Sequence, residues 1–193
     1  MTIEKTEPSH HQVIAATRLW LQRAVIGLNL CPFAKGVHGK GLVRYVVSDA
    51  QDDEELLNDL ERELQVLLAA PPDEVDTTLL IHPTALNAFA DFVRFLDLVE
   101  VVLRTQRLQG VLQVASFHPD YVFADSDADD ITNCTNRSPF PTLHLLREAS
   151  LDRAVAAFPD AAAIYERNLQ TLRELGHAGW RELGVGAPPG DRE

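Results

Sequence analysis

Residues 111–148, VLQVASFHPDYVFADSDADDITNCTNRSPFPTLHLLRE, are the stretch from which the rest of the sequence is best interpreted. The stretch begins with an apolar, β-branched run at 111–117 that is typical of a strand. From Leu143 onward, its apolar residues return at the spacing of a helix. Proline turns, an acidic run and the pair Asn136-Arg137 lie between. We therefore expect a strand, a long polar loop and a helix.

The same patterns extend to both sides of this stretch. Further strands are predicted at 42–48 and 77–81, and residues 121–123 are a candidate fourth strand at the edge. Helices are predicted at 13–30, from the acidic run at 52–55 to the prolines at 71–72, and at 85–104, 143–158 and 160–175. The order α-β-α-β-α-β-α-α predicts an α/β protein with a small, mainly parallel sheet of three to four strands flanked by helices.

The chain is long enough for one complete hydrophobic core. Its 193 residues predict a flexible arm at 1–10, a single α/β domain at 11–183 and a disordered tail at 184–193. The formal net charge of −12 argues against nucleic-acid partners, which need clustered Lys and Arg. No apolar run is long enough for a membrane span, and no signal peptide is visible. With two cysteines in the whole chain, we expect a cytoplasmic protein.

Two of the predicted strands end in the same dipeptide, His-Pro. These are His82-Pro83 and His118-Pro119. In open α/β sheets, ligands usually bind beyond the carboxyl ends of the strands. If the two strands are parallel, His82 and His118 emerge at one edge of the sheet, with Asp120 just beyond.

The predicted helix at 143–158 adds two polar groups to this set. His144 and Glu148 are four residues apart and therefore share a helix face, which continues as the apolar Leu151 and Val155. A face that is apolar in its later turns directs the polar groups of its first turn inward. Because buried polar groups need partners, we expect His144 and Glu148 to approach the loop residues.

Several kinds of chemistry fit these residues. In the first, a divalent metal is held by nitrogen and oxygen ligands, with His118, Asp120, His144 and Glu148 as candidates. In the second, the same four residues are catalytic, with a carboxylate orienting a histidine that moves a proton. In the third, Cys31 or Cys134 is a nucleophile assisted by a histidine. The alternative to all three is a buried hydrogen-bonded network that fixes the long loop.

Further residues are candidates for ligand binding. Arg137 is the expected contact for a carboxylate or phosphate, and Asn136, Asn133 and His82 complete the set. The leading hypothesis is an enzyme that acts on a small anionic molecule through a His/carboxylate site, either metal-dependent or acid–base. The alternative is a non-catalytic ligand-binding or protein-interaction module in which the same residues form a structural network.

Five stretches of the sequence point to a known family. They are RLWLQRAVIGLNLCPFAKGV, RYVVSDA, DTTLLIHP, LQGVLQVASFHPDYVFA and DDITNCTNRSPFPTLHLLREAS. Together they resemble the bacterial domain-of-unknown-function family 1415, over residues 13–180. The resemblance implies no particular activity and assigns no catalytic residues. The functional expectations therefore depend on the residues themselves.

Overall fold

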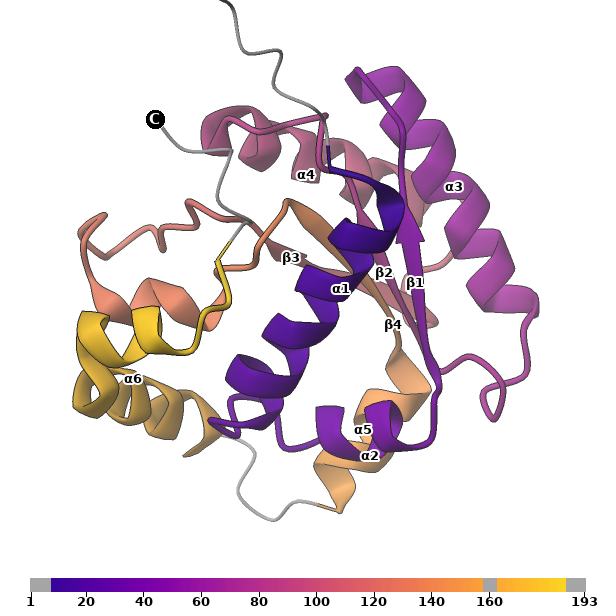
Figure 1. Ribbon diagram of the computed structural model, residues 1–193. Coiled ribbons are helices and arrows are strands. Elements are labelled where there is room, and N and C mark those ends of the chain that lie inside the picture. The colour runs from indigo at the N-terminus through magenta and orange to yellow at the C-terminus, as the bar shows by residue number, and fades with distance from the viewer. Residues whose placement is uncertain (1–7, 158–162, 187–193) are drawn as a thin grey trace, which may run out of the picture.

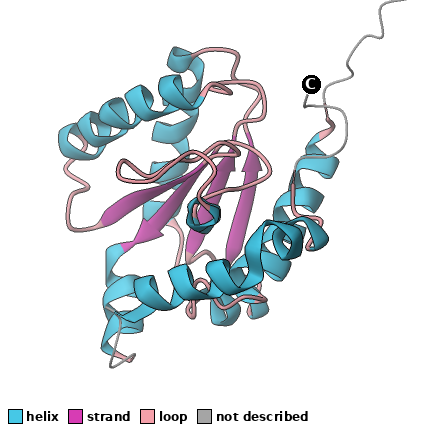
Figure 2. Cartoon of the chain, turned by 90° about the vertical axis from the view of Figure 1, so that its left-hand side faces the viewer, coloured by secondary structure: helices cyan, strands magenta, loops and turns pink. Residues whose placement is uncertain are grey.

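The computed structural model describes residues 8–157 and 163–186, and it confirms the α/β class. Helices lie on both sides of one sheet (Figures 1 and 2). Along the chain the elements are α1 (His10–Trp20), a π-helix (Leu21–Ile26), α2 (Ala34–Gly39), β1 (Val43–Val47), α3 (Asp53–Ala69), β2 (Thr77–Ile81), α4 (Phe89–Thr105), β3 (Leu112–Phe117), a 3-10 helix (Ile131–Thr135), β4 (Thr142–Arg147), α5 (Glu148–Ala156) and α6 (Ala163–Glu182).

The sheet has four strands in the order β1-β2-β4-β3. β1 and β2 are parallel, whereas β4 is antiparallel to both of its neighbours, β2 and β3. The three strands predicted from sequence therefore all run in one direction. The prediction of a mainly parallel sheet is nevertheless wrong, because β4 is inserted between β2 and β3 and makes two of the three pairings antiparallel.

β4 occupies the start of the segment for which a helix was predicted. Leu143 and Leu145 point to one face of the sheet, and His144 lies between them on the other. A central strand covered on both faces is apolar almost throughout, so its short sequence does not distinguish strand from helix by period. The helix begins only at Glu148. The candidate edge strand at 121–123 is irregular backbone.

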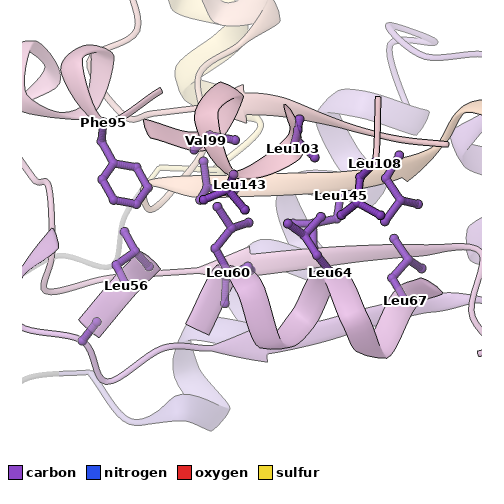
Figure 3. Packing of buried hydrophobic residues seen from close by; sticks show 14 of the residues in the cluster. Leu56, Leu60, Leu64, Leu67, Phe95, Val99, Leu103, Leu108, Leu143 and Leu145 are labelled. Atoms are coloured by element: carbon purple, nitrogen blue, oxygen red, sulfur yellow. The ribbon is translucent and has the colours of Figure 1, made fainter. Parts of the chain in front are cut away.

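One face of the sheet packs against α3 and α4. Leu56, Leu60, Leu64 and Leu67 form a row along α3 and point toward Leu143 and Leu145 of β4 and toward α4 residues such as Phe95 and Val99 (Figure 3). Each of these leucines is fully buried. The spacing of three and four residues along α3 produces this contact, because it places the leucines on one helix face.

The other face is covered by the N-terminal helices. Ser9 and Gln12 form a capping box at the start of α1, and the helix continues without interruption into the π-helix. Trp20 packs edge-on against Phe117 of β3, with 5.1 Å between ring centroids. α2 forms in the glycine-containing segment before β1, where no helix was predicted.

α6 packs against the 3-10 helix and the turn after the π-helix. Leu172 is buried with Leu30 and Cys134, and Asn168 Nδ2 donates to the Leu30 carbonyl at 2.9 Å. Gly176 directly follows the helix predicted at 160–175, and its φ of 63° interrupts the helix there, although the helical conformation resumes after it.

The expected arm and tail lie mostly outside the described residues. Within residues 8–157 and 163–186, no helix has the length and hydropathy needed to cross a bilayer.

Candidate functional site

His82 and His118 emerge at the same end of the sheet, as the direction of β2 and β3 requires. Each is 0% exposed. Both rings pack against Phe92 of α4, with centroid distances of 5.8 Å for His82 and 5.2 Å for His118. The two histidines are therefore brought together, but in the core and not at a solvent-exposed edge.

Their hydrogen bonds hold the backbone between β2 and α4. His82 Nδ1 donates to the Ala85 carbonyl at 3.0 Å. His118 Nε2 donates to the Leu86 carbonyl at 3.2 Å, and His118 Nδ1 accepts from the amide of Asp120 at 3.0 Å. Leu86 has φ of 57°, a conformation that costs energy for a bulky side chain. The imidazoles thus anchor two consecutive carbonyls at a strained turn.

Burial lowers the pKa of His82 to about 4, so the ring is neutral at physiological pH. Its Nε2 atom is buried without a hydrogen-bond partner among the described residues. A neutral, enclosed imidazole of this kind is suited to holding a turn. It is poorly placed to exchange protons with a substrate.

Asn133 and Asn136 fix the loop between β3 and β4. Asn133 Oδ1 accepts from Phe123 N at 3.0 Å and from Ser126 Oγ at 2.6 Å, while its Nδ2 donates to the Asp127 carbonyl at 2.8 Å. Asn136 Nδ2 donates to the Ser116 carbonyl at 3.2 Å. These amides are occupied within the protein, which agrees with the structural alternative for this part of the predicted site.

His144 lies in the middle of β4, opposite Leu79 of β2 and Ala115 of β3. Its Nε2 is 2.7 Å from Thr77 Oγ1, and the Thr77 hydroxyl is 2.6 Å from the Leu145 carbonyl. A hydroxyl has one hydrogen, which here is donated to the carbonyl. His144 Nε2 must therefore donate to Thr77, and Nδ1 carries a lone pair. Burial lowers the pKa of His144 to about 4.

Glu148 is not beside His144. It is the first residue of α5, and its Oε1 accepts from the Gly110 amide at 3.2 Å, just before β3. The shared helix face that was predicted for these two residues does not exist, because His144 belongs to a strand.

The proposed metal ligands are consequently dispersed. His118, His144 and Glu148 lie at the end of β3, in the middle of β4 and at the start of α5, and Asp120 is exposed. Within the part of the chain that the structure describes, no three His, Cys, Asp or Glu side chains are grouped closely enough to hold a metal ion. The expectation that these four residues form one cluster is therefore wrong.

An apolar cavity of about 290 Å³ lies against the sheet face that carries His144. Residues from α1, the π-helix, α2, α5 and the strands surround it. Its apolar wall includes Trp20, Leu21, Val25, Phe33, Leu79 and Phe117.

The polar groups at this cavity are almost all paired within the protein. Ser150 Oγ donates to Asp76 Oδ1 at 2.5 Å. Arg147 donates to backbone carbonyls, including that of Ala70 at 2.6 Å. His144 Nδ1 differs, because it has no hydrogen bond to any residue in 8–157 or 163–186.

The π-helix forms part of the cavity wall through Leu21 and Val25. An extra residue in a helical turn is an uncommon arrangement that occurs frequently at functional sites. The apolar pattern of 13–30 identified these residues only as core. The change from α- to π-helix leaves no signal in that pattern, so this part of the cavity wall could not be predicted from it.

Of the two cysteines, Cys31 borders this cavity and Cys134 does not. Both thiols are free. Cys134 is 2% exposed, and burial raises its pKa. Cys31 and His144 line the same cavity, which makes Cys31 the more suitable of the two candidate nucleophiles.

Asp120 and Arg137 line a different, polar cavity of about 560 Å³ beside the C-terminal part of α6. The residues predicted to form one site are thus divided among a buried histidine pair, an apolar cavity and a polar cavity.

The fold and these sites define an α/β protein with an apolar cavity on one face of its sheet. The chain belongs to the family described as protein of unknown function (DUF1415), whose model matches residues 12–182. Searches of curated proteins and of solved structures found no match to the chain.

Proposed function

We propose that the protein binds a small, largely apolar molecule in the cavity beneath His144. The volume of about 290 Å³ is near the lower end of the range for small-molecule sites, which are typically apolar with a few polar groups that orient the ligand. His144 Nδ1 would accept a hydrogen bond from a hydroxyl or amide N–H of the ligand.

The observation that carries this proposal is the unpartnered acceptor in an apolar wall. Nδ1 faces the cavity and is not sealed in the core. A ligand donor at Nδ1 would therefore add a hydrogen bond worth on the order of 1 kcal/mol. The Thr77 hydroxyl fixes the ring so that Nδ1, not Nε2, is the atom available to the ligand.

The charge state of His144 indicates the chemical class of ligand. A pKa of about 4 leaves the ring neutral near pH 7, so it attracts a donor and not an anion. This property favours the ligand-binding alternative over the expected site for an anionic substrate. We place the protein in the cytoplasm, since both cysteines are free, and its charge of −12 argues against nucleic acid as a partner.

Toluene and p-cresol, which differ only by a hydroxyl, test the proposal. We expect both to bind, with p-cresol about tenfold tighter because of its hydrogen bond. His144→Leu should bind the two equally. The Thr77 hydroxyl keeps its acceptor at Leu145 in that variant, so the sheet should remain intact.

Ala115→Leu provides the second arm, because it fills the cavity directly opposite His144 and should abolish binding of both compounds. Ala149→Leu adds the same volume at an exposed position of α5 and is the matched control. Calorimetry and NMR titration measure the affinities. If the wild type binds neither compound, or binds them unchanged in Ala115→Leu, the proposal is wrong.

A second candidate function, acyl transfer, is favoured by the presence of Cys31 in the same cavity. The Cys31 thiol would give its proton to His144 Nδ1 while its sulfur attacks the carbonyl carbon of an acyl thioester. The carbon–sulfur bond of the thioester then breaks, and the departing thiolate takes the proton. His144 is a weak base at a pKa of about 4, which places this candidate second.

Mass spectrometry after incubation with a short-chain acyl thioester tests this chemistry. Acylation of Cys31 should be faster in the wild type than in His144→Leu, and absent in Cys31→Ser. Equal rates in the wild type and His144→Leu would exclude the histidine as the base.

A further inference from the structure

The polar cavity beside α6 is separate from the apolar one. It has a volume of about 560 Å³ and shares no lining residue with the cavity at His144. Its charged and aromatic lining comes from the loop after β3, from Arg137 and from the end of α6: Asp120, Asp129, Arg137, Trp180 and Arg181.

Arg137 is held firmly at the wall of this cavity. Its Nε donates to the Tyr121 carbonyl at 3.1 Å, and its Nη2 donates to the Ala128 carbonyl at 2.7 Å. These bonds orient the guanidinium without neutralising it. Because the side chain is half-buried, its charge is less screened than that of a fully exposed arginine.

None of the four charged residues at this cavity pairs with another. Among the described residues, no carboxylate lies within ion-pair distance of Arg137 or Arg181, and no cation lies within that distance of Asp120 or Asp129. Two positive and two negative groups therefore lie around one cavity without pairing to each other, although Nε and Nη2 of Arg137 already donate to backbone carbonyls.

From this arrangement we infer that the cavity binds a small zwitterion of the α-amino-acid type. Arg181 suits the ligand carboxylate because its planar N–H donors match the two carboxylate oxygens, and Arg137, whose Nε and Nη2 bind carbonyls, adds positive charge. Asp120 and Asp129 supply acceptors for the ligand ammonium. The indole of Trp180 offers an apolar surface for the ligand side chain. A simple anion would meet the same two aspartates without compensation.

Three probes of similar shape test the inference: L-leucine, 4-methylpentanoate without the amino group, and isopentylamine without the carboxylate. Calorimetry on the full chain should show L-leucine binding at least about tenfold tighter than either of the others, since it alone satisfies both kinds of charge. Equal or tighter binding of 4-methylpentanoate would overturn the inference, as would no binding of L-leucine.

Two variants assign the contacts. Arg181→Gln should weaken L-leucine binding several-fold, and Asp120→Asn should do so while improving binding of 4-methylpentanoate. Both side chains are exposed and neither supports the core. Arg104→Gln makes the same charge change on α4, away from this cavity, and should leave binding unchanged. Equal affinities in Arg181→Gln, Asp120→Asn and the wild type would overturn the inference.

The outcome is independent of the function proposed for the apolar cavity. His144→Leu should abolish the preference for p-cresol and leave L-leucine binding unaltered, because His144 does not line the polar cavity.

Discussion

His82 and His144 lie on opposite faces of the sheet, and burial holds both as neutral rings. Each has its pKa lowered from 6.5 to about 4. The unfolded chain therefore binds more protons than the folded chain between pH 6.5 and 4. It follows that the stabilising effect of keeping these rings neutral is complete above pH 6.5 and is lost as the pH falls toward 4.

We expect the free energy of unfolding to decrease by about 2 kcal/mol per histidine between pH 7 and pH 5. Urea titrations at the two pH values measure this change. In His144→Leu, the decrease in unfolding free energy between pH 7 and pH 5 should be smaller by about 2 kcal/mol, because one of the two histidines is gone. A variant with the full wild-type difference would show that His144 does not titrate as described.

The side chain of Asn133 holds the loop between β3 and β4. It is 0% exposed, and its amide bonds to Phe123, Ser126 and Asp127. Asn133→Ala leaves these groups without partners, so we expect it to cost roughly 3 kcal/mol of unfolding free energy. Asn87→Ala removes an exposed bond to the Thr84 carbonyl and should cost less than about 1 kcal/mol. Chemical denaturation of both variants makes the comparison.

At the scale of elements, α4 ends without the residue best suited to its geometry. Arg107 follows the C-cap of α4 with φ of 58°, where glycine is usual. Its amide bond to the Arg104 carbonyl is a backbone interaction that any residue can make. Arg107→Gly should therefore raise the unfolding free energy by about 0.5–1 kcal/mol.

Gly110 provides the opposite test in the same turn, because its φ is 77°. Gly110→Ala should lower the unfolding free energy by about 1 kcal/mol, although nothing lies near the added methyl group. Thermal unfolding of both variants checks the prediction. Destabilisation by Arg107→Gly would mean that the arginine side chain contributes contacts that outweigh the backbone strain.

Sequence patterns predicted the elements with local signals and failed where the tertiary context decides. β2 was predicted at its observed bounds, and β1 and β3 to within one residue at an end. β4 was not recognised, because Leu143, Leu145 and Leu146 satisfy a helical period as readily as a strand buried on both faces. Because a helix was predicted from Leu143 onward, Glu148 was expected beside His144. The expected metal site therefore combined residues that lie apart in the structure.

The His-Pro pattern was more informative about the site. It correctly placed His82 and His118 at one end of the sheet. It could not show that both rings would be covered, because the cover comes from Phe92 of α4 and depends on how that helix packs on the sheet. The apolar cavity depends in the same way on packing among α1, α2 and α5, which no local pattern encodes.

For the whole molecule, the order of strands predicts a gradient of local stability. β2 and β4 are central, and β1 and β3 are edges that pair on one side only. We expect amides of β2 and β4 to exchange with solvent deuterium more slowly than those of β1 and β3, because central strands open only with the whole sheet. Exchange monitored by NMR or mass spectrometry tests this. Equal protection in all four strands would indicate a single cooperative unit.

The insertion of β4 also has a consequence for synthesis on the ribosome. β3 pairs only with β4, and β4 separates it from β2. Before residue 147 has left the ribosome, β2 and β3 have been made but β4 cannot yet pair with them. The edges of β2 and β3 that β4 will occupy are therefore unpaired. Unpaired edges invite association with other chains. Until β4 has emerged, we expect this chain to be bound by the chaperones that shield newly made proteins.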